Sequence, residues 1–346
     1  MNVSPIKLGL FAAYDSGVPN NKDDYFTLVI LHGFAWHSGI FSRFLPIAGK
    51  HNARIILRHL ALKLEASGEG ASLILQDYAR ERAKELYDFL EAVVVKEKIP
   101  KNKGLTIAGW SFGTVWITAF LAYASSFPVG KVRLAPYIRR LVAYDPPYHA
   151  FGYPPPDAFY NPLFDPSLTP GEGVKLFPSW VSGYYQHGES ASSLEHRVSS
   201  RDIIPTIERL SAEDVASALY PPPANPGGSD AIFMDSGIKY GLFSLLRKLA
   251  LFPKKPVNEH EEDWNKIELR YLWCDRSVWE MPWGAWALQA EISNTVEPEP
   301  GHQKRPIHMI RVTGANHFAH WDDSERALHA MISDDLDKID SLRSSL

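Results

Sequence analysis

The chain has 346 residues, 45% of them apolar, and a formal net charge of −4. A chain of this length can bury one large core or two modest ones. The nearly balanced charge excludes the strongly basic surface typical of nucleic-acid-binding proteins, and the single cysteine, Cys274, excludes an internal disulfide framework.

The ends of the chain bear on location. Residues 1–17 lack the basic start and long apolar run of a secretory signal. No stretch offers the roughly eighteen uncharged apolar residues of a membrane-spanning helix. We therefore predict a cytoplasmic protein with no membrane span. The C-terminal Ser344-Ser345-Leu346 is distantly similar to the peroxisomal Ser-Lys-Leu signal, so the peroxisome is a weaker alternative.

Short apolar runs and helical patterns alternate along most of the chain. Strands are predicted at residues 26–32, 53–59, 105–109, 140–144, 268–273 and 308–313, and helices at 73–98 and 111–126. This alternation is typical of a largely parallel sheet with helices on both faces. The fold class is therefore predicted to be α/β.

Residues 146–265 interrupt that alternation. They open with a proline-rich stretch, 146–171, that regular structure does not tolerate. Helical patterns follow at 211–219 and 236–251, with a second proline-rich break between them at 220–228. We predict a core made of residues 1–145 and 266–346, and a mainly helical cap, 146–265, inserted between two strands.

The residues Gly109-Trp110-Ser111-Phe112-Gly113 match the pattern G-x-S-x-G. A predicted strand precedes them and a predicted helix follows. In such a turn the flanking glycines let strand and helix approach closely, and the serine hydroxyl stands above the sheet. Ser111 is therefore the candidate nucleophile. An ordinary serine at a helix N-terminus is the simpler alternative.

A histidine follows the last predicted strand, in Gly314-Ala315-Asn316-His317-Phe318. A loop at that edge of the sheet can reach back to Ser111, and the chain order serine, acid, histidine also fits. His317 is therefore the candidate base.

Together, His32-Gly33-Phe34, the turn around Ser111 and the stretch around His317 resemble the three signature stretches of the α/β-hydrolase family. The resemblance implies a mostly parallel sheet of eight strands, Ser–His–acid chemistry and a substrate-shaping cap in the insert. It also implies that backbone N–H groups of Phe34 and Phe112 form the oxyanion hole.

The acid is open between two residues. In the resembling family it follows the penultimate strand, and a match without gaps puts Ser277 at that position. Asp275 lies two residues earlier, and Asp145 ends the strand after the nucleophile helix. Either could orient the histidine, with Glu280 a more remote candidate. We predict that Asp145 lies within hydrogen-bond reach of a ring nitrogen of His317, with Asp275 as the rival.

Aromatic residues cluster near these loops. Those expected to line a substrate pocket, rather than simply to fill the core, are Trp36, Trp110, Tyr184, Tyr185 and Trp279. Such a pocket would suit a small apolar or aromatic substrate. No metal-ligand spacing or nucleotide-binding glycine motif occurs, so we expect neither metal nor cofactor. The oligomeric state is open.

The resemblance therefore implies a serine hydrolase acting on a carboxylic ester, lactone or thioester through an acyl-enzyme on Ser111. Two alternatives stay open. One is a lyase, similar to hydroxynitrile lyases, or a cofactor-free oxygenase on the same fold. The other is a non-catalytic binding protein, because fold alone does not establish an activity.

Overall fold

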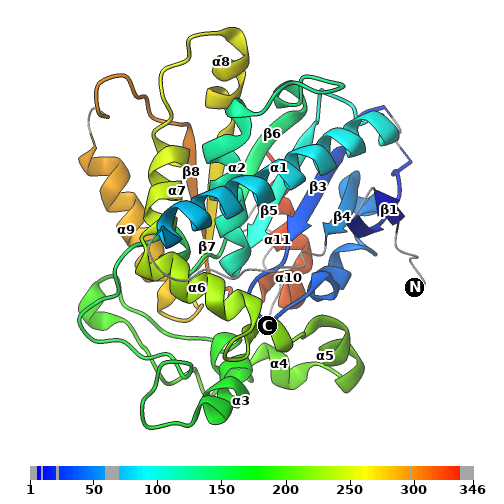
Figure 1. The fold of residues 1–346 in the computed structure, drawn as a ribbon. Helices are drawn as coiled ribbons and strands as arrows, with labels where there is room; N and C mark the ends of the chain where they lie inside the picture. The colour runs from blue at the N-terminus through cyan, green and yellow to red at the C-terminus, as the bar shows by residue number, and fades with distance from the viewer. Residues whose placement is uncertain (1–5, 9–10, 21–22, 59–69, 296–297, 336–346) are drawn as a thin grey trace.

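A computed structural model describes residues 6–8, 11–20, 23–58, 70–295 and 298–335. An eight-stranded sheet runs through the molecule in the order β1-β2-β4-β3-β5-β6-β7-β8 (Figure 1). The strands span Ile6–Leu8, Phe11–Asp15, Phe26–Leu31, Ala53–Arg58, Leu105–Trp110, Ile138–Tyr144, Glu268–Cys274 and Ile307–Val312 for β1 to β8. β2 pairs antiparallel with both of its neighbours, β1 and β4, and the remaining neighbouring pairs are parallel. The predicted α/β class and strand number are confirmed.

Successive residues of the central strands point into two different cores. Val29 and Leu31 pack with α1 (Ala71–Glu97), α2 (Thr114–Tyr123) and α7 (Leu242–Leu251) on one face of the sheet. Leu28 and Ile30 pack with α11 (Ser324–Ile332) on the other (Figure 1). Because both faces are covered, these strands are apolar at almost every position.

The six strands predicted from the sequence are present, with ends shifted by a residue or two. β1 and β2 were not predicted from the sequence. The helix expected over 236–251 is two helices, α6 (Ser229–Lys239) and α7, separated at Tyr240 and Gly241, where Gly241 has φ +70°.

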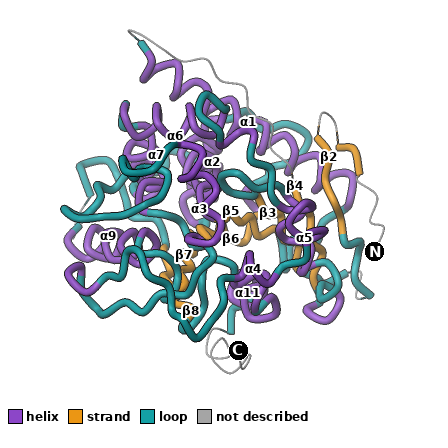
Figure 2. The backbone as a smooth tube through the Cα atoms, turned by 90° about the horizontal axis from the view of Figure 1, so that it is seen from below, coloured by secondary structure: helices purple, strands orange, loops and turns teal. Residues whose placement is uncertain are grey.

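The inserted segment, residues 146–265, connects β6 to β7. Its helices are α3 (Pro170–Val181), α4 (Thr206–Arg209), α5 (Ala212–Ala218), α6 and α7, and α8 (Glu259–Lys266) extends just past its end. α3, α4 and α5 lie together at one end of the sheet in two perpendicular views (Figures 1 and 2). α7 instead packs against α2, in the helical layer over the sheet. The division at 145 and 265 stays a prediction, and α7 sits beside the core rather than with α3 to α5.

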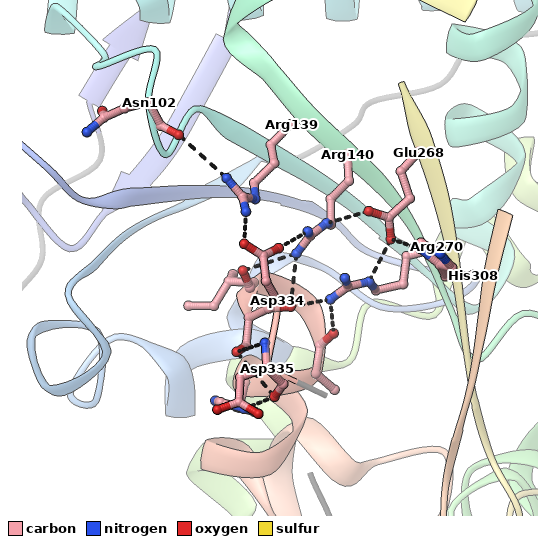
Figure 3. A network of polar contacts seen from close by, with 12 residues as sticks. Asn102, Arg139, Arg140, Glu268, Arg270, His308, Asp334 and Asp335 are labelled. Atoms are coloured by element: carbon pink, nitrogen blue, oxygen red, sulfur yellow. Dashed lines mark hydrogen bonds and ion pairs between the residues drawn. The ribbon is translucent and has the colours of Figure 1, made fainter. Parts of the chain in front are cut away.

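A network of arginines near the amino ends of β6 and β7 anchors the end of α11 (Figure 3). Arg140 on β6 and Arg270 on β7 donate to the backbone oxygen of Ser333 at 3.1 and 2.7 Å. Both also pair with Glu268. The last carbonyl groups of a helix lack partners within the helix, so buried cations there stabilise its end. The anchoring holds the segment that follows the His317 loop against the sheet.

Within the described residues, no helix is long and apolar enough to cross a membrane. The C-terminal Ser344-Ser345-Leu346 lies outside the described residues.

Candidate active site

Ser111 occupies a strained turn directly after β5. Its backbone has φ +56°, the left-handed region that non-glycine residues rarely adopt. The flanking glycines are required by close packing. A Cβ on Gly109 would lie 2.5 Å from the backbone oxygen of Gly113, and one on Gly113 would lie 2.5 Å from the backbone oxygen of His32. The G-x-S-x-G spacing therefore has the steric cause that the sequence suggested.

Asp145 directly follows β6 and is completely buried, with 0% exposure. Its Oδ2 lies 2.7 Å from Nδ1 of His317 and accepts a hydrogen bond from the Ser277 hydroxyl at 2.5 Å. Its Oδ1 accepts from the backbone N–H of Cys274 at 2.7 Å. Both carboxylate oxygens are thus engaged, as a buried charge requires. The predicted contact between Asp145 and His317 is present.

Asp275, the rival, has other partners. Its Oδ2 accepts from Nε of Arg311 at 3.0 Å, and its Oδ1 accepts from the backbone N–H of Gly314 at 2.5 Å. Gly314 begins the loop that carries His317. Asp275 therefore holds the base of that loop and does not contact the imidazole.

His317 is 1% exposed and is held from two sides. The ring of Trp110 stacks on its imidazole, with centroids 4.7 Å apart and planes 29° apart. The Trp110 indole also donates to the His317 backbone oxygen at 3.0 Å. Trp110 is the neighbour of Ser111 in the chain, so the same residue links the serine turn to the histidine loop. Among the described residues, no hydrogen bond joins Ser111 to His317; such bonds are often long in unliganded enzymes.

Ser111 lines a small cavity of about 30 Å³. Phe34 and Phe112 line it beside the serine, with their rings edge to face at 6.3 Å. The inserted segment contributes Phe177 from α3 and Met234 from α6. Residues of that segment therefore cover the serine, and the cavity is largely apolar.

The loop bearing Phe34 is fixed by contacts on both sides. Gly33 approaches Ser111 so closely that a Cβ on it would lie 2.8 Å from the Ser111 Cβ. Ala35 has φ +64°, and its backbone oxygen accepts from the N–H of Tyr220 at 2.8 Å. Tyr220 belongs to the inserted segment, which is thus hydrogen-bonded directly to the candidate oxyanion loop.

The aromatic residues predicted to line the pocket have other positions. The lining of the Ser111 cavity includes none of the five predicted residues, which are Trp36, Trp110, Tyr184, Tyr185 and Trp279. The prediction fails for this cavity because each side chain is taken up in packing or a hydrogen bond elsewhere.

Their contacts show where they are used. Trp36 packs edge to face on Phe318 at 5.2 Å. The hydroxyl groups of Tyr184 and Tyr185 donate to Asp322 and to the backbone oxygen of Trp180 at 2.7 and 2.9 Å. The Trp279 indole donates to the backbone oxygen of Tyr160 at 2.6 Å. Buried tyrosine and tryptophan usually find such partners.

Three polar side chains line the cavity that sequence reasoning did not assign to it: His149, Asn161 and Glu280. Burial lowers the pKa of His149 to about 4, so this imidazole is neutral near pH 7. Burial raises the pKa of Glu280 to about 7. Glu280 contacts Asn161 and not His317. No local motif marks these residues; they meet only because the inserted segment folds back over the strand ends.

Among the described residues, no group of three or more His, Cys, Asp or Glu side chains could hold a metal ion.

The chain is similar to solved structures of low sequence identity. One is epoxide hydrolase VrEH1 from Vigna radiata, with 13% identity, 97% of each chain covered and a TM-score of 0.47. Another is haloalkane dehalogenase DbeA from Bradyrhizobium elkani USDA94, with 13% identity, 98% of this chain and 99% of that chain covered, and a TM-score of 0.45. No family model and no curated protein matches the chain.

These likenesses are too distant to transfer an activity, so the class rests on the chain's own architecture. The strands from β4 to β8 are parallel in the order β4-β3-β5-β6-β7-β8. A strained serine follows β5, and a buried histidine lies beyond β8 in contact with a carboxylate after β6. This arrangement is an α/β-hydrolase fold.

Proposed function

We propose that this protein is a serine hydrolase that cleaves a carboxylic ester, lactone or thioester with an apolar or aromatic group. The observation that carries the proposal is the buried pair of Asp145 and His317, joined at 2.7 Å and packed through Trp110 against the turn of Ser111. A strained serine beside a histidine that a carboxylate orients is the arrangement that nucleophilic catalysis needs.

In the proposed mechanism, Nδ1 of His317 donates to Asp145, which leaves Nε2 free to accept the Ser111 proton. Ser111 Oγ attacks the substrate carbonyl, and the alcohol or thiol leaves with the proton from His317. Water, activated by the same histidine, then releases the acid from the acyl-enzyme. The backbone N–H groups of Phe34 and Phe112 stabilise the oxyanion in both steps.

The size of the cavity bears on substrate entry. A volume of about 30 Å³ is roughly a tenth of that of a small ligand pocket. Binding a larger acyl group therefore requires displacement of side chains of the inserted segment, among them Phe177 and Met234. Their apolar character supports an apolar substrate.

The test uses p-nitrophenyl esters of short and long acids, alongside aryl lactones. The wild-type protein should release a burst of p-nitrophenol equal to the enzyme present, followed by steady turnover. Ser111→Ala should lose the burst and at least about 10³-fold in turnover. The exposed Ser72→Ala on α1 should behave as wild type.

Two results would contradict the proposal. Turnover by Ser111→Ala within tenfold of wild type would remove the serine from the mechanism. Absence of any burst or turnover over the whole set of esters and lactones would favour a lyase, an oxygenase or a binding protein.

A further inference from the structure

The cavity at Ser111 has a hydrogen-bonded polar pair in a largely apolar lining. We call this pair, Glu280 and Asn161, the polar corner. Glu280 begins α9 (Glu280–Asn294) and is only 5% exposed. Asn161 lies in the proline-rich start of the inserted segment and is 4% exposed. Polar groups buried in an apolar cavity carry a large desolvation cost, so a ligand that pairs with them gains affinity.

The geometry of the polar corner is fixed by backbone contact. The N–H of Leu163 donates to Oδ1 of Asn161 at 2.9 Å. This contact orients the amide, whose Nδ2 donates to Oε1 of Glu280 at 2.9 Å. Within the described part of the chain, Oε2 of Glu280 has no hydrogen-bond partner, and no cation pairs with this carboxyl group. One oxygen of a buried carboxyl group is therefore left for a ligand.

The chemistry of that ligand follows from the two states of the carboxyl group. Because burial raises the pKa of Glu280 to about 7, the neutral and charged forms are both populated near neutral pH. The charged carboxylate can only accept hydrogen bonds, whereas the neutral carboxyl group can both accept and donate. A hydroxyl group is both donor and acceptor, so it satisfies either state. The charged form of Glu280 would repel an anionic group, and no cation lines the cavity to offset that repulsion.

We propose that the polar corner binds a hydroxyl group on the acyl part of the substrate, and that Glu280 selects hydroxylated acyl groups over alkyl ones. The acyl part is assigned because it is the portion that stays bound to Ser111, in the same cavity as Glu280. This inference rests on the proposed serine hydrolase function and specifies its substrate class.

The experiment compares p-nitrophenyl hydroxyalkanoates with the hydroxyl on successive carbons of the acyl chain. Each ester is paired with its counterpart bearing a methyl group in place of the hydroxyl. For the best-placed hydroxyl, wild-type kcat/KM should exceed that of the methyl counterpart at least about tenfold. Glu280→Met should bring this ratio close to one.

Two further variants make the result specific. Glu280→Gln keeps the shape but not the charge, so at about pH 8.5 it should lower the ratio severalfold. It also decides the matter if Glu280→Met fails to fold. Glu213→Gln, on the exposed surface of α5, should keep the wild-type ratio.

The outcomes separate the two proposals. Ser111-dependent turnover with no preference at any hydroxyl position overturns the role of Glu280 and leaves the hydrolase function standing. A preference that persists unchanged in the Glu280 variants also overturns it. No turnover of any ester overturns both.

Discussion

The hydroxyl of Ser277 donates to Oδ2 of Asp145 at 2.5 Å, across 132 positions of the chain. Ser277 stands where a match to the α/β-hydrolase family without gaps would put the acid. In this protein the side chain at position 277 instead hydrogen-bonds the carboxylate of Asp145, which follows the neighbouring strand β6. β6 and β7 are adjacent and parallel, so the residues after them meet at one edge of the sheet. A carboxylate from either strand end can therefore reach the same histidine.

The first prediction separates the two candidate acids. Asp145→Asn should lower kcat/KM for a p-nitrophenyl ester by up to about 10⁴-fold, because an amide favours the wrong tautomer of His317. Asp275→Asn should cost less than about tenfold, since an asparagine can still accept from the N–H of Gly314. Steady-state kinetics of the two variants, with Tm as a check on folding, measures this. The reverse order of effects would assign the acid to Asp275.

A second prediction moves the acid to the neighbouring strand. Asp145→Ser combined with Ser277→Asp should recover at least about tenfold of the activity lost by Asp145→Ser alone. The hydrogen bond between these two side chains places them within reach of the same imidazole. Ser277→Asp alone should shift the pH profile, because two adjacent carboxylates cannot both ionise easily. A double variant no more active than Asp145→Ser would show that position 277 cannot orient His317.

A third prediction tests the packing of the oxyanion loop on the nucleophile. A Cβ on Gly33 would lie 2.8 Å from Cβ and 3.3 Å from Oγ of Ser111. Gly33→Ala should therefore lower kcat by about 10²-fold by displacing the loop or the serine, and cost about 1–3 kcal/mol of stability. Gly49→Ala is the control, since nothing lies within 4 Å of a Cβ there. Near wild-type kcat in Gly33→Ala would mean that the loop plays no part in the reaction.

A fourth prediction concerns stability and pH. Burial raises the pKa of Glu280 from 4.5 to about 7, so the folded state holds its proton more tightly than the unfolded state. The contribution of Glu280 to the unfolding free energy should therefore fall as pH rises from about 4.5 to 7, and stay lower above that range. The full difference corresponds to about 3 kcal/mol.

Urea unfolding at about pH 5 and pH 8 tests this with Glu280→Gln, which cannot ionise. The variant should gain up to about 3 kcal/mol relative to wild type between the two conditions. Asp230, whose pKa burial raises to about 6, is present in both proteins and cancels in the comparison. Glu213→Gln should show no such gain. A pH-independent difference for Glu280→Gln would indicate that this carboxyl group stays ionised when buried.

Much of the candidate site is readable in the chain before the fold is known. The glycines around Ser111 mark a turn that only a close strand–helix approach explains, and the structure has that approach. The stretch around His317 follows a strand that the sequence also predicts. The residues that line the pocket could not be predicted in the same way. Trp110 and Tyr184 were predicted to line it and do not, because aromatic character is the same whether a ring faces a cavity or packs in the core.

The sequence by itself determined the order of β3 to β8 along the chain, the serine turn and the histidine loop, because these depend on local steric and periodic patterns. Only the tertiary structure shows that Asp145 and not Asp275 contacts His317, since both residues follow a strand and differ only in which neighbours they meet. It also brought Asn161 and Glu280 into the Ser111 cavity from segments 119 residues apart. Such contacts arise from the path of the inserted segment over the sheet, which no local pattern encodes.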